Sequence, residues 1–396
     1  MYYHNMGHSA TYDVLGDVRP HLSGDQIVGG AALKGRGATS NQTGRYECQK
    51  RANFDDGWGG AAGAFGLFDV EGTVSNPPAL KTTVQEEVTK RIITRNSSPD
   101  IPFDRSINPY RGCEHGCIYC FARPTHAFMG LSSGLDFESR LFAKRDAAKL
   151  LEKELSRPNY KVAPIAMGTN TDPYQPVEKE RRITRSILEV LERAAHPVTI
   201  VTKSRLIVRD MDILSRMAAQ NLVRVAVSVT TLDHKLSARL EPRACSPQRR
   251  LDAIRLLHDA GVPVGVMVAP VIPAITDMDL ERILKAAYHA GARTAAYIML
   301  RLPREVAPLF EAWLDVHYPD RKGKVLAHIR TVRGGKMSDS QYGRRMRGAG
   351  LEAELLNRRF KNALRRYGYD TRIRPLDRSR FIPPCRLNAG QLSLAL

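Results

Sequence analysis

Residues 108–126 read NPYRGCEHGCIYCFARPTH and place Cys113, Cys117 and Cys120 within eight residues of one another. The whole chain has six cysteines, so half of them lie in this one stretch. Proteins of reducing compartments rarely contain disulfides, and a tight group of cysteines there more often binds a metal or performs redox chemistry. The stretch therefore predicts a metal or redox site.

The spacing of the three cysteines leaves two kinds of metal site open. A structural zinc site needs four ligands, and His115 or His126 is the candidate for the fourth. An iron–sulfur cube held by three thiolates instead keeps one iron without a protein ligand, and that iron can bind a substrate or cofactor. Gly112 and Gly116 would let the backbone wrap closely around such a cluster. The second alternative favours catalysis over simple electron transfer, where four protein ligands are usual.

The composition indicates a globular protein with many helices and strands. A chain of 396 residues that is 43% hydrophobic can bury one large core of α/β-barrel size or two smaller cores. No apolar run approaches the roughly 18 residues of a membrane helix. Residues 1–20, MYYHNMGHSATYDVLGDVRP, lack the basic and apolar regions of a secretory signal. We therefore expect a cytoplasmic protein without a membrane partner.

Positive charge is concentrated near the C-terminus. The formal net charge is +19, and residues 321–386 contain 19 Lys and Arg against five Asp and Glu. Such a region is typical of proteins that bind nucleic acid or another polyanion. A solvated basic surface without a dedicated partner explains the charge equally well, so both interpretations stay open.

The chain divides into three regions. Residues 1–95 are rich in Gly, Asn, Asp and Ser and show no sustained period, so we expect a poorly structured leader that carries no chemistry. Residues 96–318 alternate short β-branched runs with amphipathic helices and form the predicted core. Residues 319–396 form a basic, largely helical C-terminal extension.

Six runs in the core predict buried strands, at residues 103–112, 161–169, 197–204, 223–231, 262–272 and 293–303. Helical patterns lie between the later strands, at residues 178–195, 205–221, 246–261 and 276–291. The last two patterns end at Gly261 and Gly291, which are plausible helix stops. Six strand–helix units favour an α/β fold with a parallel sheet, as an incomplete or a complete barrel. The chemistry then lies at the carboxyl ends of the strands, and the cysteines follow the first strand directly.

A further helix is predicted within residues 343–375. Leu351, Leu355, Phe360 and Leu364 recur at helical spacing and would pack on the barrel. Cations occupy other positions around this helix, where they would face water or a polyanion: Arg358, Arg359, Lys361, Arg365 and Arg366.

The segment CEHGCIYC, residues 113–120, resembles the C-x3-C-x-aromatic-C signature of the radical S-adenosylmethionine (radical SAM) superfamily. The resemblance implies a partial (β/α)6 TIM-type barrel with a 4Fe-4S cluster on Cys113, Cys117 and Cys120. It also implies that S-adenosylmethionine binds the open iron through its amino and carboxylate groups. One electron would then split the cofactor into methionine and a 5'-deoxyadenosyl radical, which abstracts a hydrogen atom from the substrate.

A narrower resemblance covers the region from the cysteines to about residue 280. Residues 240–273, LEPRACSPQRRLDAIRLLHDAGVPVGVMVAPVIP, are similar to the spore photoproduct lyases, which repair a thymine dimer in DNA. This resemblance implies five positions that contact S-adenosylmethionine. Tyr119 would pack beside the adenine, Asn170 would bind the methionyl end and Lys203 would pair with the carboxylate. Ser228 and Ala269, at the ends of the fourth and fifth strands, would suit the methionyl and adenosyl groups. An ordinary loop aromatic, a turn residue and a solvent-facing lysine are the alternatives for the first three.

The sequence also departs from those lyases. Their hydrogen-donating cysteine after the second strand is replaced by Gly168 in IAMGTNTD, which puts thymine-dimer repair in doubt. Cys245 and Cys385 are the remaining candidates for a donor, or else incidental thiols. Glu241 and Arg243 in LEPR would either shape the substrate pocket or form an ion-paired turn.

These observations predict a radical SAM enzyme, of lyase or transferase type, that receives its electron from a protein such as a flavodoxin or ferredoxin. Nucleic acid is the candidate substrate, and a monomer is expected. The alternatives are a radical SAM modifier of RNA, protein or a small metabolite, and a non-catalytic iron–sulfur protein that binds nucleic acid or senses redox state. Formation of 5'-deoxyadenosine under strong reduction separates the enzymes from the non-catalytic protein.

Overall fold

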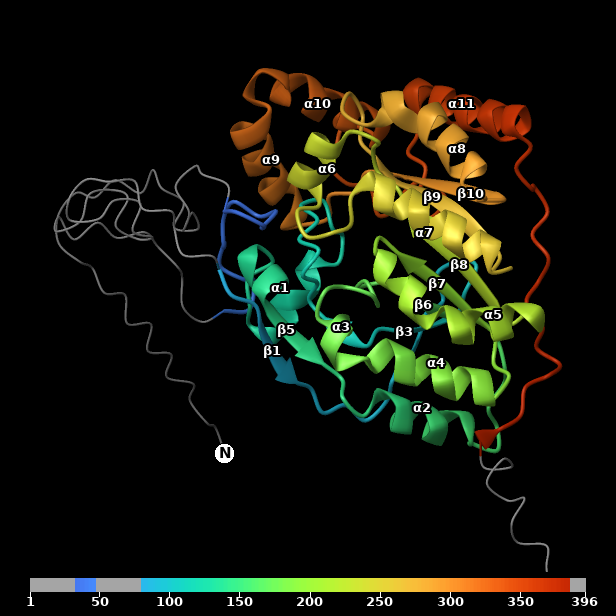
Figure 1. The fold of residues 1–396 in the computed structure, drawn as a ribbon. Coiled ribbons are helices and arrows are strands. Elements are labelled where there is room, and N and C mark those ends of the chain that lie inside the picture. The colour runs from blue at the N-terminus through green and yellow to red at the C-terminus, as the bar shows by residue number, and fades with distance from the viewer. Residues whose placement is uncertain (1–32, 48–79, 385–396) are drawn as a thin grey trace, which may run out of the picture.

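The fold is built on one open, mostly parallel sheet. The computed structural model describes residues 33–47 and 80–384 (Figure 1). Six strands run parallel and lie side by side in chain order: β3 (Arg105–Ile107), β6 (Ile165–Met167), β7 (Val198–Thr202), β8 (Val223–Ser228), β9 (Val264–Val271) and β10 (Thr294–Met299). β2 (Ile93–Arg95) pairs antiparallel with β3 at one edge. In the described part of the chain the strand order runs from β10 to β2, so the barrel is partial, and the predicted six strand–helix units are confirmed.

Apolar side chains hold helices against the outside of the sheet. In β7 and β8, Val and Ile at every second position are fully buried and share one core with apolar residues of the helices. The covering helices are α2 (Ala147–Leu155), α4 (Ile183–Arg193), α5 (Met211–Ala219), α7 (Pro247–Asp259) and α8 (Leu280–His289). Gly261 and Gly291 follow α7 and α8 with φ angles of 74° and 108°, so the predicted helix stops are confirmed.

A small second sheet carries the cysteine stretch. It contains β1 (Thr83–Glu86), β5 (Arg140–Ala143) and β4 (Tyr110–Arg111). The first predicted strand, residues 103–112, therefore divides into β3 and β4, and β4 leads directly to the first cysteine. Between β4 and β5 lie η1 (Arg123–Met129) and α1 (Leu135–Ser139). Four short helices follow the carboxyl ends of the main strands: α3 (Glu178–Arg181), η2 (Arg205–Asp210), α6 (His234–Leu240) and η3 (Asp277–Asp279).

Three helices follow the last strand: α9 (Val306–His317), α10 (Pro319–Val332) and α11 (Leu351–Tyr367). α11 confirms the predicted helix and packs on α8. Its buried face includes Phe360, as predicted, but Leu351 and Leu355 are 69% and 47% exposed, so their predicted packing is wrong. The buried positions on α11 are Ala353, Leu356, Phe360 and Ala363. The buried stripe is therefore rotated relative to the predicted one.

The segment after α11 crosses the amino ends of the strands. Figure 1 shows it descending from α11 past α5 toward α2. Its backbone amides donate hydrogen bonds to carbonyl oxygens just before β10, β8 and β7. The donors and acceptors are Asp370 and Arg293 (2.8 Å), Asp377 and Asn221 (2.9 Å), and Ile382 and Ala194 (2.9 Å). The extension is thus packed along the core.

The predicted leader falls mostly outside the described residues, which include 33–47 and 80–95 of it, and Cys385 also lies outside them. The boundaries at 95 and 318, the monomeric state and the cytoplasmic location stay predictions. Within the described residues, no helix is both long and apolar enough to span a membrane.

Candidate functional site

The three cysteines share one loop between β4 and η1, at the carboxyl end of the sheet. Cys113 and Cys117 are buried, Cys120 is half-buried, and all three are free thiols. Burial, the charge of Asp172 and the other two thiols raise the pKa of Cys113 well above its usual value. Burial raises the pKa of Cys117 to about 12 and also raises that of Cys120. Three thiolates in this position need a cationic group to balance them, and the irons of an iron–sulfur cluster supply that charge. The donor set therefore fits the cluster that the sequence predicts.

The loop depends on two glycines. Gly112 and Gly116 have φ angles of 74° and 65°, in the left-handed region that side chains other than glycine rarely adopt. A Cβ on Gly116 would lie 2.7 Å from a carboxylate oxygen of Glu138, and one on Gly112 would lie 2.7 Å from Leu141. Both glycines are therefore required for the loop to close against its neighbours.

A single zinc ion fits the loop less well. The ring of His115 faces Asp172, with Nδ1 3.4 Å from Oδ2, and His126 Nε2 lies 2.9 Å from the carbonyl oxygen of Arg140. Within residues 33–47 and 80–384, no three His, Cys, Asp or Glu side chains surround a point that could hold one metal ion. Thiolates of a cube bind different irons, so they need not converge on one ion. The arrangement favours the cluster over zinc.

Arg123 holds the cysteine loop from inside. This fully buried side chain donates to the carbonyl oxygens of Gly116 (3.1 Å) and Cys117 (2.9 Å), and it forms a buried ion pair with Glu138. Paired buried charges are costly to break, so the pair fixes the loop in one conformation. In the sequence, Arg123 has no signal other than its place three residues after Cys120.

Part of the predicted leader packs on the same carboxylate. The backbone amides of Gly37 and Ala38 donate to Glu138 at 2.9 and 2.8 Å, and Arg36 donates to its carbonyl oxygen at 2.8 Å. A Cβ on Gly37 would lie 1.8 Å from the carbonyl oxygen of Gly116. Residues 33–47 therefore support the cysteine loop, which their composition did not indicate.

The loop between β6 and α3 braces the cysteine loop from a second side. Gln175 donates to the carbonyl oxygen of Gly112 (3.2 Å) and accepts from the amide of Glu114 (2.8 Å). Nearby, Asp172 accepts from Thr202 Oγ1 and from the backbone amide of Lys203, both at 2.7 Å. Burial alone would raise the pKa of Asp172, but the adjacent imidazole and these hydrogen bonds lower it to about 2.

The LEPR segment braces the loop from a third side. The carbonyl oxygen of Leu240 accepts from the amide of Ile118 at 3.0 Å. Arg243 pairs with Glu114 at 3.1 Å, and its amide donates to the carbonyl oxygen of His115 at 3.3 Å. LEPR is therefore a contact surface for the cysteine loop.

Glu241 is the most enclosed acid of this segment. It forms a buried ion pair with Arg250 and accepts from Thr230 Oγ1 (2.6 Å) and from the hydroxyl of Tyr119. Burial opposes its ionisation, yet the charges of Arg250 and Lys203 lower the pKa of Glu241 to about 2. Of the two interpretations of LEPR, the ion-paired turn is present, and it also positions Tyr119.

The structure brings four of the five predicted cofactor positions together. Lys203 Nζ lies 5.9 Å from the centre of the Tyr119 ring. Thr230 Oγ1 lies 3.3 Å from the Tyr119 hydroxyl and 3.1 Å from the carbonyl oxygen of Ala269. Ser228 is buried at the end of β8, and its carbonyl oxygen accepts from Arg250, the partner of Glu241.

Asn170 follows β6 at the same end of the sheet. Its backbone amide donates to Oδ1 of Asn108 at 3.0 Å, so the side chain is presented from a fixed turn beside the cysteine stretch. The roles of all five residues toward S-adenosylmethionine remain predictions.

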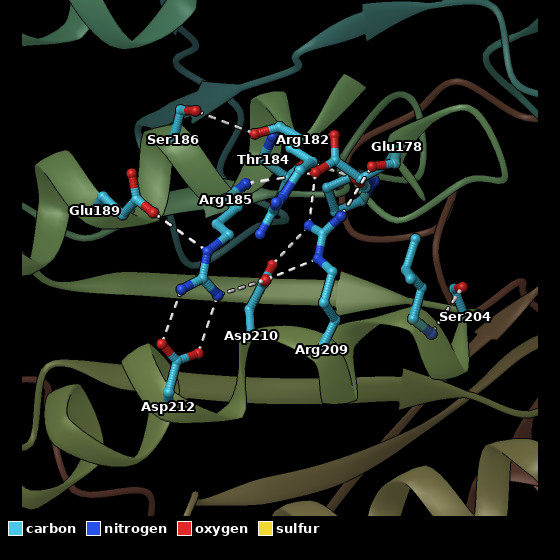
Figure 2. Close-up of polar contacts among 12 residues, drawn as sticks. Glu178, Arg182, Thr184, Arg185, Ser186, Glu189, Ser204, Arg209, Asp210 and Asp212 are labelled. Carbon is cyan, nitrogen blue, oxygen red and sulfur yellow. Dashed lines mark hydrogen bonds and ion pairs between the residues drawn. The ribbon is translucent and has the colours of Figure 1, made fainter. Parts of the chain in front are cut away.

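Ion pairs join α3, which follows the loop after β6, to η2, which follows β7, and Figure 2 shows the residues that form them. Arg209 lies between Glu178 and Asp210, with contacts of 2.8 Å to each, and Arg185 contacts Asp210 at 3.0 Å. Both carboxylates are fully buried. Tyr110, in β4, donates its hydroxyl to Glu178. The network thus connects the strand before the cysteines with the loops after β6 and β7.

Exposed aromatic rings lie beside arginines around the cysteine loop. Phe121, which directly follows the third cysteine, is 46% exposed, and the guanidinium carbon of Arg301 lies 5.4 Å from its ring centre. Nε of Arg301 is buried and has no hydrogen-bond partner among the described residues. Tyr46 and Phe128 stack with their ring centres 5.6 Å apart, and Arg45 lies over both rings. These side chains form an aromatic and cationic rim at the carboxyl end of the sheet.

One region of the chain matches the sequence model of a known family. Residues 107–287 match the sequence model of the radical SAM superfamily, and they include the cysteine loop and the strands from β6 to β9. This region of the chain is similar to the radical SAM superfamily.

Two sequence relatives are named only as uncharacterized proteins. An uncharacterized protein of Mycobacterium tuberculosis (strain H37Rv) is 37% identical over 222 residues, which is 56% of this chain and 65% of that protein. An uncharacterized protein of Methanocaldococcus jannaschii is 26% identical over 215 residues, or 54% of this chain and 76% of that protein. The match therefore spans less than two thirds of the length of the mycobacterial relative.

Solved structures share the fold of the radical SAM domain. A spore photoproduct lyase in complex with a dinucleoside spore photoproduct aligns with a TM-score of 0.51 and 18% identity, over 72% of this chain and 79% of that chain. A double mutant of that lyase with bound AdoMet and the same dinucleoside aligns with a TM-score of 0.50 and 17% identity, over 72% and 78%. At this identity the likeness shows the fold alone.

The position predicted to replace the cysteine of the lyases has no room for any side chain. Gly168 has a φ angle of 84°, and a Cβ there would lie 1.9 Å from the carbonyl oxygen of Val201. Cys245 is the one cysteine outside the loop within the described residues, and its Sγ accepts from the backbone amide of Arg205 at 3.2 Å. A role for Cys245 as a hydrogen-atom donor stays a prediction.

Proposed function

We propose that this protein is a radical SAM enzyme that cleaves S-adenosylmethionine reductively and acts on a nucleic-acid substrate. The observation that carries the proposal is the loop with three buried thiols, held on three sides by charged and polar side chains. Cys113, Cys117 and Cys120 would hold a 4Fe-4S cluster, which would supply the electron that converts S-adenosylmethionine to methionine and a 5'-deoxyadenosyl radical.

The residues around the loop suit the binding of S-adenosylmethionine. Lys203 provides an ammonium group for the carboxylate of the cofactor, and its place over the Tyr119 ring orients both side chains. Glu241 accepts the Tyr119 hydroxyl, so the ring is held at one angle. Asn170, Ser228 and Ala269 would contact the methionyl and adenosyl groups from the ends of their strands.

The rim at the carboxyl end supports a nucleic-acid substrate. Exposed rings bind bases by stacking, and arginines bind the adjoining phosphates. Phe121 and Arg301 combine both features next to Cys120, and Arg301 has an unused buried donor among the described residues. Because position 168 admits no side chain, a cysteine there cannot return the hydrogen atom. The reaction proposed here therefore differs from dimer repair in the origin of that hydrogen, and the electron would come from a flavodoxin or ferredoxin.

The test of cofactor chemistry is anaerobic reconstitution of the full chain with iron and sulfide. We expect about four irons per protein and formation of 5'-deoxyadenosine under strong reduction. Cys117→Ala should lose iron and lower cleavage at least about a thousandfold, because an incompletely held cube is unstable. Cys245→Ala is the matched control and should keep both. Stoichiometric zinc without iron uptake would disprove the proposal, and a stable cluster without cleavage would support the non-catalytic alternative.

A second experiment tests the substrate class. Binding to single- and double-stranded DNA and RNA is measured at near-physiological salt, for wild type and for Phe121→Leu and Arg301→Gln. Each variant should weaken binding about fivefold to a hundredfold, the range for one stacked base, and should leave cleavage without substrate unchanged. If wild type and variants bind every nucleic acid equally weakly, the substrate is a protein or a small molecule.

A further inference from the structure

A cavity lies at the amino end of the sheet, opposite the cysteine loop. Its volume is about 540 Å³, and it is lined by the residues before β8, the starts of β9 and β10, and the segment after α11. The segment closes the cavity through hydrogen bonds from Arg224 to the carbonyl oxygen of Arg374 and from Asn221 Nδ2 to that of Pro375 (2.9 Å). The cavity therefore exists only because the C-terminal extension crosses the strands here.

The charges of this cavity are unbalanced. Two aspartates line it, Asp370 and Asp377, and Asp377 already accepts from Ser379 and Arg380. Five arginines line it: Arg224, Arg293, Arg372, Arg374 and Arg380. Of these, only Arg380 forms an ion pair within residues 33–47 and 80–384. The remaining four cations face the cavity without a carboxylate partner among the described residues.

Arg224 is a half-buried cation among these four. Its guanidinium group is half-buried, and burial lowers its pKa. Its one hydrogen-bond partner among the described residues is a carbonyl oxygen, which carries no full charge. Removing a cation from water without a counter-charge is costly. An anion in the cavity would supply that counter-charge.

We propose that this cavity binds a small anion that carries two or more phosphate groups. Guanidinium groups bind phosphate oxygens in a bidentate manner, and several arginines line this half-open cavity. The volume lies within the roughly 300–1,000 Å³ of small-molecule sites. A ligand with several negative charges can contact several arginines at once, whereas a ligand with a single carboxylate cannot.

The lining distinguishes a small anion from a nucleic-acid strand. No Phe, Trp or Tyr side chain is among the described residues of the lining, whereas single strands bind by stacking their bases on such rings. The rim at the other end of the strands does contain exposed rings. This binding site is independent of the proposed reaction, because it shares no residue with the cysteine loop.

The test is calorimetric titration of the full chain with tripolyphosphate at near-physiological salt. We expect saturable binding at one site, weakened at least tenfold by Arg224→Gln and about threefold by Arg372→Gln. Arg358→Gln removes an exposed charge from α11, outside the cavity, and should leave the affinity unchanged. Thermal unfolding of each variant checks that it is folded.

Arg372 decides the result if Arg224→Gln does not fold, because the exposed Arg372 side chain makes no hydrogen bond or ion pair within the described residues. The absence of saturable binding by wild type would overturn the proposal. Equal weakening by Arg358→Gln and Arg372→Gln would also overturn it, since binding would then follow net charge alone. A single-stranded DNA oligonucleotide that displaces tripolyphosphate and binds more tightly would show a backbone-binding surface instead of a small-molecule site.

Discussion

The two ends of the parallel sheet differ in whether their charged side chains have partners of opposite charge. At the carboxyl end, Glu241 pairs with Arg250, and Glu138 pairs with Arg123. At the amino end, Arg224 and Arg293 line a cavity without a carboxylate partner in the described part of the chain. The buried acids Glu241 and Glu138 at the first end have arginine partners, while the second end has arginines without a carboxylate partner among the residues that the structure describes.

This difference shows what the buried pairs do. Replacing a buried ion pair by apolar residues is often neutral for stability, so pairs are weak evidence for stability alone. Here the acids of the pairs also accept from Tyr119 and from the backbone of residues 37 and 38, and Arg123 donates to the carbonyl oxygens of the loop. We infer that the pairs set the conformation of the loop. Four predictions test how different the two ends are.

The largest effect is expected at the carboxyl end. Glu241→Gln leaves Arg250 as an unpaired buried cation, and breaking such a pair costs about 4 kcal/mol of unfolding free energy. Chemical denaturation measures the loss. Glu114→Gln is the matched control, because its partner Arg243 is 37% exposed and the loss should stay below about 1 kcal/mol. Equal losses of unfolding free energy in both variants would mean that the burial of an ion pair does not affect the cost of breaking it.

Acid should destabilise the amino end through one buried imidazole. His196 is fully buried between Tyr160 and Phe381, and burial lowers its pKa to about 4. The unfolded chain binds this proton near pH 6.5, so the unfolded state holds more protons between the two values. Stability is then present above pH 6.5 and is lost as the pH falls, by about 2.5 kcal/mol between pH 7 and pH 4.5.

Denaturation at both pH values measures this dependence. His196→Phe should reduce the wild-type difference by about 2.5 kcal/mol, and the buried His126, whose pKa burial also lowers to about 4, should account for a comparable part. His234→Phe, at an exposed position, should leave the difference unchanged. A pH dependence that is unchanged in His196→Phe would show that other groups carry it.

The sequence predicted the features that depend on local pattern. The three cysteines, the six strands and the stops at Gly261 and Gly291 each need only a few neighbouring residues, and all are present. Contacts between distant segments carried no such signal. Gly37 and Glu138 lie about a hundred residues apart, and neither belongs to a recognisable motif.

The C-terminal extension shows the same limit. A helix was predictable from its apolar spacing, but the face that is buried depends on α8, which no pattern within α11 specifies. Leu351 and Leu355 were therefore assigned to the wrong face. The cavity at the amino end requires the chain after α11 to return to β8 and β10, and charge counts could indicate only that a polyanion was a candidate partner.

A smaller effect is expected for Lys203 at the carboxyl end. Lys203→Ala should weaken S-adenosylmethionine binding by about 2 kcal/mol, the value for a hydrogen bond to a charged group. Lys203 contacts Asp172 through its backbone amide, which alanine keeps, so iron content should stay normal. Equilibrium titration measures the affinity, with the exposed Lys149→Ala as control. Unchanged affinity in Lys203→Ala would remove this residue from the cofactor site.

The smallest change in stability is expected for substitutions of two neighbouring cations of α11, Arg358 and Arg359. Arg359 donates to both carboxylate oxygens of Glu281 at 2.7 Å and so holds α11 on α8, whereas Arg358 is exposed and has no ion-pair partner within the described residues. Arg359→Gln should lower the unfolding free energy by less than about 1 kcal/mol, since the pair is partly exposed, and Arg358→Gln should not change it.

If α11 binds nucleic acid, Arg358→Gln should instead reduce the salt dependence of that binding by about one phosphate contact, with a log–log slope smaller by about 0.9 on duplex DNA. Arg359→Gln should leave that slope unchanged, because its guanidinium group is already occupied by Glu281. Equal changes of the slope in both variants would show that α11 attracts polyanions by net charge alone, and the extension would then serve only to close the amino end of the sheet.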